Sequence, residues 1–208
     1  LLTSQGTQSR WLDARKVLTV SPGEAGPQVH WDASRAKLEQ FLAETPTDLL
    51  VITGYIASTP EGVATTLKRN GSDFSAAIFG NLLDAAAIEI WSDVDGILSA
   101  DPRRVPEAVV LDELSYQEAM ELAYFGAKVI HPHTMAPALA KNIPLISKNT
   151  FNPTHPGTRI HRATQPLREG QSPVKAFSTV ENVALINVEG TGMIGVPGIA
   201  QRLFGALR

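Results

Sequence analysis

Residues 64–105 constrain the fold of this chain more than any other stretch, because they combine a glycine-containing loop, a helix, a strand and a second polar loop. The first loop covers residues 68–73, the strand residues 88–91 and the second loop residues 92–96. The helix between them is predicted from apolar residues at helical spacing, namely Phe74, Ala77, Ile78 and Leu82. If the strand runs parallel to its neighbours, ligands bind at the carboxyl ends of strands and the amino ends of helices, and both loops fit that placement.

The rest of the first 161 residues alternates between helix and strand patterns. Helices are predicted from Asp32 to about Ala43, from the capping-box pair Ser115 and Glu118 to Gly126, and over residues 134–141. Short strands are predicted at residues 11–14, 17–20, 49–53, 109–111 and 143–147, with a loop at 21–29 and a polar turn at 57–63. The apolar run at 49–53 is typical of a strand buried on both faces. The alternation predicts an α/β fold with a largely parallel sheet.

Composition excludes several classes of partner and chemistry. Apolar residues make up 43% of the 208 residues, enough for a sizeable core, and the net charge of −3 gives no sign of a nucleic-acid or membrane partner. The absence of cysteine excludes thiolate chemistry and is compatible with a reducing compartment, the cytoplasm or, in a plant, a plastid. Because the chain starts at Leu1 without a leader pattern and stops inside an amphipathic pattern at residues 202–208, we expect a piece of a longer protein.

A change in composition predicts a domain boundary. Residues 162–173 are polar, with two prolines and a glycine, which is typical of a linker. We therefore expect one domain over residues 1–161 and a second over residues 174–208. The second begins with a predicted strand at residues 183–188, followed by a glycine-rich loop and the start of a helix.

The two polar loops of the central stretch are compatible with phosphate chemistry and also with ordinary turns. A glycine loop that leads into a helix can hold phosphate through backbone N–H groups and the helix dipole. The simpler interpretation is a turn at Gly71 with Ser72 or Asp73 as the helix cap. In the second loop, Asp93 and Asp95 can hold Mg²⁺ beside nucleotide phosphates, or form an Asx turn.

Other polar residues carry weaker signals. Asp101 and Arg103 are most simply a capped turn, and Lys128 is a cation near a helix end, where it interacts favourably with the helix dipole. His131 and His133 have no neighbouring carboxylate in the sequence. They are interpreted as loop histidines, hydrogen-bonded to backbone, rather than as metal ligands.

Five stretches together resemble the aspartokinase family in their order and spacing: residues 65–77, 91–96, 101–103, 115–119 and 125–132. Residues 188–193 resemble the opening of that family's regulatory ACT domain. The whole chain is most similar to the branch that joins aspartokinase to homoserine dehydrogenase. The resemblance implies an α/β fold of the three-layer αβα amino-acid-kinase type, present in part, followed by the start of an α+β ACT domain.

The resemblance implies transfer of phosphate from MgATP to the side-chain carboxylate of L-aspartate, the first step toward lysine, threonine and methionine. Arg69 and Asp73 would be the catalytic residues, with Arg69 clamping a carboxylate of aspartate and Asp73 near Mg²⁺. Tyr55 and Ser72 would complete the substrate site. ATP would contact Gly71, Ser92, Asp93, Leu98, Arg103 and Lys128.

The resemblance also implies regulation through the second domain. ACT domains of the family pair and bind an end-product amino acid such as threonine or lysine, which implies a homo-oligomer. Asn187, Gly190 and Gly192 would border that effector site.

The sequence departs from the family pattern in three ways. Lys68 and Leu98 stand where the family often has glycine and tyrosine, and the loss of the tyrosine ring affects one contact to the nucleotide. The family's first strand and its lysine loop have no counterpart, so this segment alone is expected to have negligible kinase activity. Two alternatives stay open: a sister amino-acid kinase that acts on glutamate or a nucleotide, and an amino-acid-sensing subunit without turnover.

Overall fold

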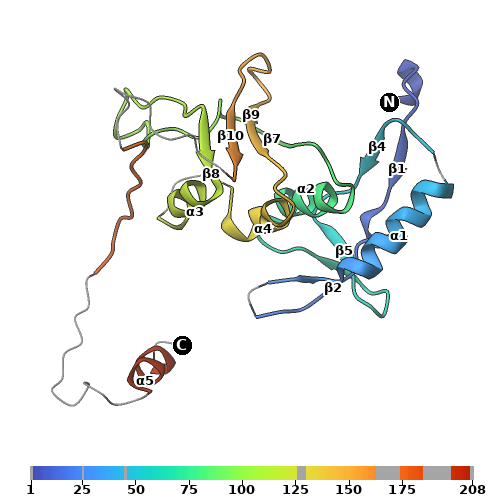
Figure 1. The fold of residues 1–208 in the computed structure, drawn as a ribbon, viewed down its shortest axis with the longest axis horizontal. Helices are drawn as coiled ribbons and strands as arrows, with labels where there is room; N and C mark the ends of the chain where they lie inside the picture. The colour runs from blue at the N-terminus through green and yellow to red at the C-terminus, as the bar shows by residue number, and fades with distance from the viewer. Residues whose placement is uncertain are drawn as a thin grey trace.

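The computed structural model describes residues 2–24, 26–44, 46–125, 130–162, 174–184 and 198–206 (Figure 1). The strands are β1 (Arg10–Leu12), β2 (Val20–Ser21), β3 (Gln28–Val29), β4 (Leu50–Ile52), β5 (Ile56–Ser58), β6 (Ala64–Thr66), β7 (Ile88–Ser92), β8 (Glu113–Ser115), β9 (Leu145–Asn149) and β10 (Thr158–His161). The helices are α1 (Trp31–Glu44), α2 (Gly71–Leu82), α3 (Tyr116–Tyr124), α4 (Pro132–Ala140) and α5 (Ile199–Ala206), with short 3₁₀ turns η1 (Thr3–Gln5) and η2 (Ala14–Lys16).

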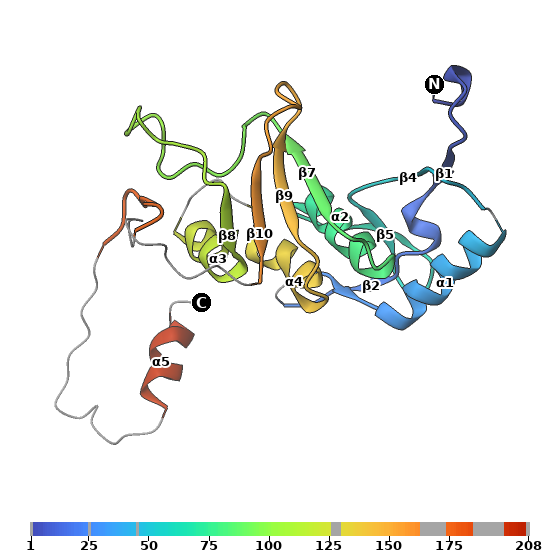
Figure 2. The same cartoon turned by 45° about the horizontal axis from the view of Figure 1, so that its top comes forward.

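A four-stranded sheet in the order β7-β9-β10-β8 forms the centre of the molecule (Figure 2). β7 pairs with β9 and β10 pairs with β8 in parallel, whereas β9 and β10 are antiparallel. The sheet is therefore largely parallel, as expected, with one antiparallel pair. The antiparallel pair is formed by β9 and β10, which follow one another in the chain and are joined by a short loop over residues 150–157. The sequence patterns did not predict β10.

Helices cover one face of this sheet. The buried cluster on that face joins residues of the strands to residues of α3 and α4, including Ile88, Leu114, Ala119, Met135, Ala138, Leu145 and Ile160. Register partners on the opposite face, such as Trp91 and Lys148, are exposed or half-buried. The alternation of buried and open positions is that of a sheet with one covered face.

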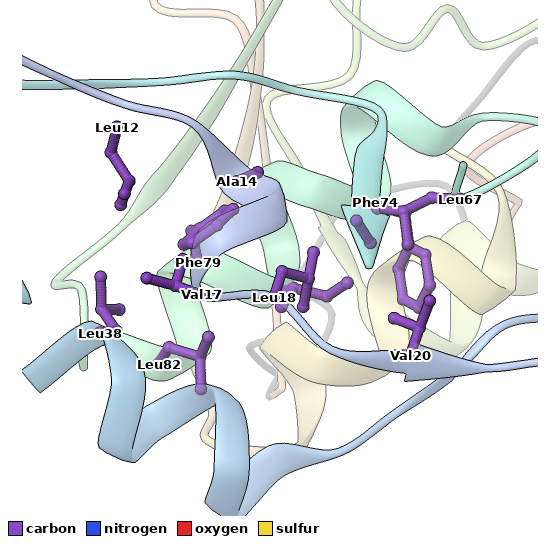
Figure 3. Close-up of a cluster of buried hydrophobic side chains, with 12 residues drawn as sticks. Leu12, Ala14, Val17, Leu18, Val20, Leu38, Leu67, Phe74, Phe79 and Leu82 are labelled. Atoms are coloured by element: carbon purple, nitrogen blue, oxygen red, sulfur yellow. The ribbon is translucent and has the colours of Figure 1, made fainter. Parts of the chain in front are cut away.

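A second core lies under the N-terminal segments. Figure 3 shows side chains of β1, η2, β2, α1 and α2 that converge there, among them Leu12, Ala14, Val20, Leu38 and Phe79. β1 and β4 form a parallel pair in which Trp11 faces Val51, and these side chains are 65% and 42% exposed. The expectation that residues 49–53 form a strand buried on both faces is therefore wrong, because one face of this two-stranded pair is uncovered.

Helix α2 joins the two cores. Nine of its residues are buried, and it packs against α4, where the Asn81 side chain donates a hydrogen bond to the Pro137 carbonyl over 2.8 Å. At its C-terminus the Arg35 guanidinium donates to the Leu82 carbonyl over 2.9 Å. A helix that is apolar all round is typical of a buried element, so α2 is fixed on several sides. The packing of α2 therefore fixes the direction in which its N-terminus points.

Several local predictions differ from the structure. The polar turn predicted at residues 57–63 is present at residues 59–63, where it joins β5 to β6, but residues 57 and 58 belong to β5. The predicted loop 21–29 contains β3, which pairs with β2. Of the strand predicted at residues 17–20, only Val20 lies in a strand, as the first residue of β2. Residues 109–111 form a single bridge, Leu98 to Val110, and the strand β8 follows them. These elements are two to three residues long, too short for a periodic pattern.

The capping box that begins α3 is confirmed. The Ser115 N–H donates to the Glu118 carboxylate over 2.7 Å, and the Glu118 N–H donates to Ser115 Oγ over 3.1 Å. Most of the predicted strand at 183–188 and most of the expected linker at 162–173 lie outside the described residues. Within the described ranges, no helix has the length and apolarity needed to cross a membrane.

Candidate active site

The first part of the site forms where the loop after β4 meets the first turn of α2. The Tyr55 N–H donates to Ser75 Oγ over 2.7 Å, and that hydroxyl donates to the Gly71 carbonyl over 2.8 Å. The Tyr55 carbonyl accepts a hydrogen bond from the Leu67 N–H at 2.8 Å. A Cβ placed on Gly54 would lie 3.9 Å from the Ser72 Cα. Thus one buried serine, Ser75, joins the end of the strand to the start of the helix.

The Tyr55 ring lies against Gly71. A Cβ placed on Gly71 would come within 2.6 Å of the tyrosine Cδ2, so only glycine leaves room for the ring. Three non-glycine residues around this junction have left-handed backbones: Tyr55 at φ 73°, Lys68 at 59° and Asn70 at 56°. Such conformations cost free energy and cluster at functional sites.

The N-terminus of α2 presents unpaired backbone donors. The helix begins at Gly71, and its N-cap residue, Asn70, makes no side-chain capping bond. The interpretation of Ser72 or Asp73 as the cap is therefore wrong, because both lie inside the first turn. Among the described residues, neither of their N–H groups has a hydrogen-bond partner in the structure. Free N–H groups at a helix start are a favourable place for an anion.

The charged side chains of this turn are open to a ligand. Arg69 and Ser72 are exposed, and no ion pair or hydrogen bond holds the Arg69 guanidinium within the described ranges. Asp73 is half-buried, and burial raises the pKa of its carboxyl group. A carboxylate that has lost water without gaining a cation is suited to a site that supplies one.

The second part of the site is the loop after β7. Ser92 is half-buried and Asp93 is exposed, while Asp95 accepts hydrogen bonds from the amides of Asn149 and Asn152 over 2.8 and 3.1 Å. These amides, first Asn149 and then Asn152, lower the pKa of Asp95. The alternative of an Asp93–Asp95 magnesium pair is not favoured, because Asp95 is occupied by protein donors. No group of three or more metal-binding side chains is found in the part of the chain that the structure describes.

The remaining predicted nucleotide contacts have different surroundings. Leu98 is half-buried and bridges to Val110, and Arg103 donates to Asp101 over 2.7 Å. Arg103, by its side chain and its backbone N–H, lowers the pKa of Asp101 to about 2. The capped turn is thus confirmed, and Arg103 is not free as the structure stands. Lys128 and the effector residues Asn187, Gly190 and Gly192 lie outside the described residues.

The two histidines have structural roles. His131 caps α4, because its Nδ1 accepts the His133 N–H over 3.2 Å. The His133 ring packs on Phe74 with ring centroids 4.6 Å apart, and burial, together with His131, lowers its pKa. His131 is hydrogen-bonded to backbone as expected, although His133 belongs to the helix rather than to a loop.

The structure thus brings the predicted residues together in two groups. Tyr55, Gly71, Ser72 and Asp73 surround the start of α2, and Ser92 and Asp93 lie at the end of β7. Because the chain reverses between α2 and β7, the start of the helix and the end of the strand lie at the same end of this unit (Figure 2). Ser75, Asn149 and Asn152 support these groups, and their sequence context carried no signal of that role.

A model of the amino acid kinase family matches residues 1–149. The chain belongs to the amino acid kinase family. Its expected fold is thereby confirmed, since the match covers the sheet up to β9 and the loops just described. The start of an ACT domain beyond residue 174 stays a prediction.

Relatives within this family include plant enzymes with two activities in their names. The chain is 51% identical over 212 residues to a chloroplastic bifunctional aspartokinase/homoserine dehydrogenase 1 of Zea mays, and all of it is covered. It is 35% identical to lysine-sensitive aspartokinase 3 of Escherichia coli, again over its full length. The chain spans only 23% of the maize relative and 45% of the bacterial one.

Solved structures agree with this family assignment. Aspartokinase III of E. coli in complex with aspartate and ADP superimposes with a TM-score of 0.72 at 36% identity, covering 79% of this chain and 37% of that one. A UMP kinase of Bacillus anthracis gives a TM-score of 0.51 at 17% identity, covering 78% and 62% of the two chains. The second likeness concerns the fold alone.

Proposed function

We propose that the protein containing this chain is an aspartate kinase, which transfers the γ-phosphoryl group of ATP to the side-chain carboxylate of L-aspartate to give 4-phospho-L-aspartate. The observation that carries the proposal is the start of α2, where Arg69 lies beside two backbone N–H groups and the Tyr55 ring, and where neither the guanidinium nor these N–H groups have a partner among the described residues. The names of the maize and E. coli relatives, which are aspartokinases, support the same acceptor.

The proposed chemistry fits these groups. A carboxylate with an ordinary pKa near 4 is already ionised at neutral pH, so it attacks phosphorus without a general base. The site must instead bring two anions together. Arg69 can hold a carboxylate of aspartate with two parallel hydrogen bonds, while the N–H groups of Ser72 and Asp73 face the anion at the helix start. Tyr55 limits the space beside them.

ATP and Mg²⁺ are proposed as the co-substrate and metal ion. Asp73 fits the metal, because Mg²⁺ in kinases takes one or two carboxylates and completes its shell with phosphate and water. When bound, the ion would offset negative charge on the phosphates. Ser92 and Asp93 would contact the nucleotide, and Leu98 its base or ribose. Arg103 would contact phosphate after leaving Asp101, and Lys128 is proposed as a further phosphate contact.

Regulation and location are proposed from the relatives. One of them is described as lysine-sensitive, and we infer that an end-product amino acid, lysine or threonine, inhibits the full protein through paired ACT domains. Because the plant relatives are named chloroplastic, a plastid is the proposed location. A homoserine dehydrogenase activity of the full protein is proposed on the same grounds.

Release of ADP by the full-length protein tests the assignment. With MgATP, we expect release only when L-aspartate is present, and a loss of at least about 100-fold in kcat/KM for Arg69→Ala, as for removal of a charged substrate contact. Arg69→Lys keeps the charge without the two-pronged geometry and should recover only part of the rate. The matched control is Arg10→Ala, which removes an exposed arginine on β1.

The alternatives give different outcomes. ADP release that responds to glutamate or a nucleotide, and not to aspartate, would assign the chain to a sister kinase. A well-folded protein that binds lysine or threonine and releases no ADP would be a sensing subunit. An Arg69→Ala variant as active as Arg10→Ala would remove Arg69 from the site.

A further inference from the structure

The loop after β7 is held by a second segment of the chain, the turn that follows β9. Asp95 Oδ1 accepts two hydrogen bonds, one from Asn149 Nδ2, on the last residue of β9, at 2.8 Å and one from Asn152 Nδ2, in the turn, at 3.1 Å. The two asparagines are 54 and 57 residues away from Asp95 in the sequence. One carboxylate oxygen therefore connects two loops that are remote in the chain.

Backbone contacts reinforce this connection at the other end of the β7 loop. The Thr150 N–H donates to the Ser92 carbonyl over 2.9 Å, and Ser92 is the register partner of Asn149 in the parallel pair β7–β9. Asp93 lies between these two attachments and is itself exposed. The segment that would face the nucleotide is thus fixed at both ends, at Ser92 and at Asp95.

The orientation of the Asn149 amide is set by its second bond. Its Oδ1 accepts the Phe151 N–H over 2.9 Å, so its Nδ2 is the atom that faces Asp95. Asn152 is similarly oriented, since its Oδ1 accepts a hydrogen bond from Thr154 Oγ1 at 3.3 Å. Each amide has one acceptor and one donor side, and both are used here.

We propose that Asn149 and Asn152 are positioning residues for nucleotide binding, acting through Asp95 to hold Ser92 and Asp93 in place. The proposal rests on the proposed function in that the nucleotide is taken to bind at the β7 loop. In this arrangement Asp95 holds the loop and does not itself contact the nucleotide or its metal. Neither asparagine touches ATP, so their loss should weaken nucleotide binding and leave the aspartate site around Arg69 unchanged.

The test is calorimetric titration of the full-length protein with MgATP, together with KM values for ATP and for L-aspartate. Asn149→Asp keeps the shape of the side chain and its bond from Phe151, and places a carboxylate against Asp95. We expect the Kd and KM for ATP to rise about tenfold, the effect of losing one charge-assisted hydrogen bond, and the KM for aspartate to change by less than about twofold. Gln8→Glu, an exposed position far from both loops in the sequence, is the charge-matched control.

A double variant distinguishes positioning from general damage. In Asp95→Asn/Asn149→Asp, the amide and the carboxylate exchange places. The amide introduced at position 95 can turn its Nδ2 toward the carboxylate introduced at position 149 and donate to it, which restores the bond between these two positions and removes the repulsion between two carboxylates. That carboxylate still accepts the Phe151 N–H, so the bond from Asn152 is the one that the exchange loses. We expect ATP affinity within about threefold of the wild type, whereas independent damage would add the two single effects.

A milder variant covers the case in which Asn149→Asp does not fold. Asn152→Ala removes one donor and leaves the Asn149 bond, and we expect ATP to bind about threefold more weakly, within the range for one hydrogen bond. ATP affinity equal to that of Gln8→Glu in both variants would overturn the proposal, as would a double variant that loses the sum of the two single effects. If the wild type binds ATP but releases no ADP in response to aspartate, while the variants show the expected losses of ATP affinity, the positioning role is supported and the proposed aspartate kinase activity is refuted.

Discussion

The ring of Tyr55 lies directly on the backbone of Gly71, so close that a Cβ on the glycine would come within 2.6 Å of the ring. The tyrosine has a left-handed backbone with φ 73°, and its N–H is held by Ser75 from the second turn of α2. Tyr55, Gly71 and Ser75 therefore set the position of the ring relative to the N–H groups of Ser72 and Asp73 at the start of the helix. The following predictions use this relationship and the proposed aspartate kinase activity.

Replacing Gly71 by alanine should displace Tyr55 and weaken aspartate binding. We expect a rise of about tenfold in the KM for aspartate, because the ring must move or rotate away from the substrate. The matched control is Gly80→Ala on the same helix, where the new Cβ would meet the Ile88 side chain in the core instead. That variant should lower the melting temperature with little effect on the KM for aspartate. Equal KM values for the two variants would refute this role of Gly71.

Ser75→Ala should destabilise the protein through the Tyr55 N–H. The variant removes the acceptor of that N–H, and an unpaired backbone donor at a half-buried position costs about 1–3 kcal/mol. The measurement is the free energy of unfolding in urea. Ser72→Ala is the control on the same helix, because Ser72 is exposed, and it should stay within about 0.5 kcal/mol of the wild type.

The elements that could be predicted from the sequence are those with long or strongly capped patterns. Helix α2 has apolar residues on all sides, and α3 has a complete capping box between Ser115 and Glu118. The hairpin β5–β6 and strand β10 were missed, because strands of three or four residues have no measurable period. β10 also depends on a pairing partner distant in the chain, its parallel neighbour β8.

The exposed residues of the candidate site could be predicted from the sequence, but the residues that hold them in place could not. Arg69 and Asp93 stand in local motifs that can be compared with a family, and both are exposed at the ends of regular elements. Ser75 has no such motif, since a serine inside a helix is most often an ordinary polar residue. Asn149 became interpretable only when the strand register placed it opposite Ser92. Contacts between remote segments cannot be derived from local spacing.

The pKa of Asp101 should report whether Arg103 moves to the nucleotide. In the free protein Arg103 lowers this pKa to about 2, and we expect nuclear magnetic resonance titration of the full-length protein to find that value. Saturating ATP should raise the pKa toward the ordinary value of about 4 as the guanidinium leaves for phosphate. Arg103→Gln should give the higher pKa without ATP. An Asp101 pKa that does not change with ATP would mean that Arg103 stays in its turn.

Tyr116→Phe should change the stability of the protein and also its pH dependence. The buried Tyr116 hydroxyl donates to the Ile143 carbonyl, and burial raises its pKa to about 12. Its removal should cost about 1–2 kcal/mol at neutral pH, because the carbonyl loses its partner. Tyr124→Phe is the control, since Tyr124 is 79% exposed.

The alkaline range gives the sharper comparison for Tyr116. The folded protein keeps this proton up to about pH 12, whereas the unfolded chain releases it near pH 10, so the contribution of Tyr116 to stability is complete below about pH 10 and is lost as the pH rises to about 12. The free energy of unfolding should therefore fall less steeply between these two pH values in Tyr116→Phe than in the wild type or in Tyr124→Phe. Parallel curves for Tyr116→Phe and the wild type would show that the hydroxyl titrates as if it were exposed.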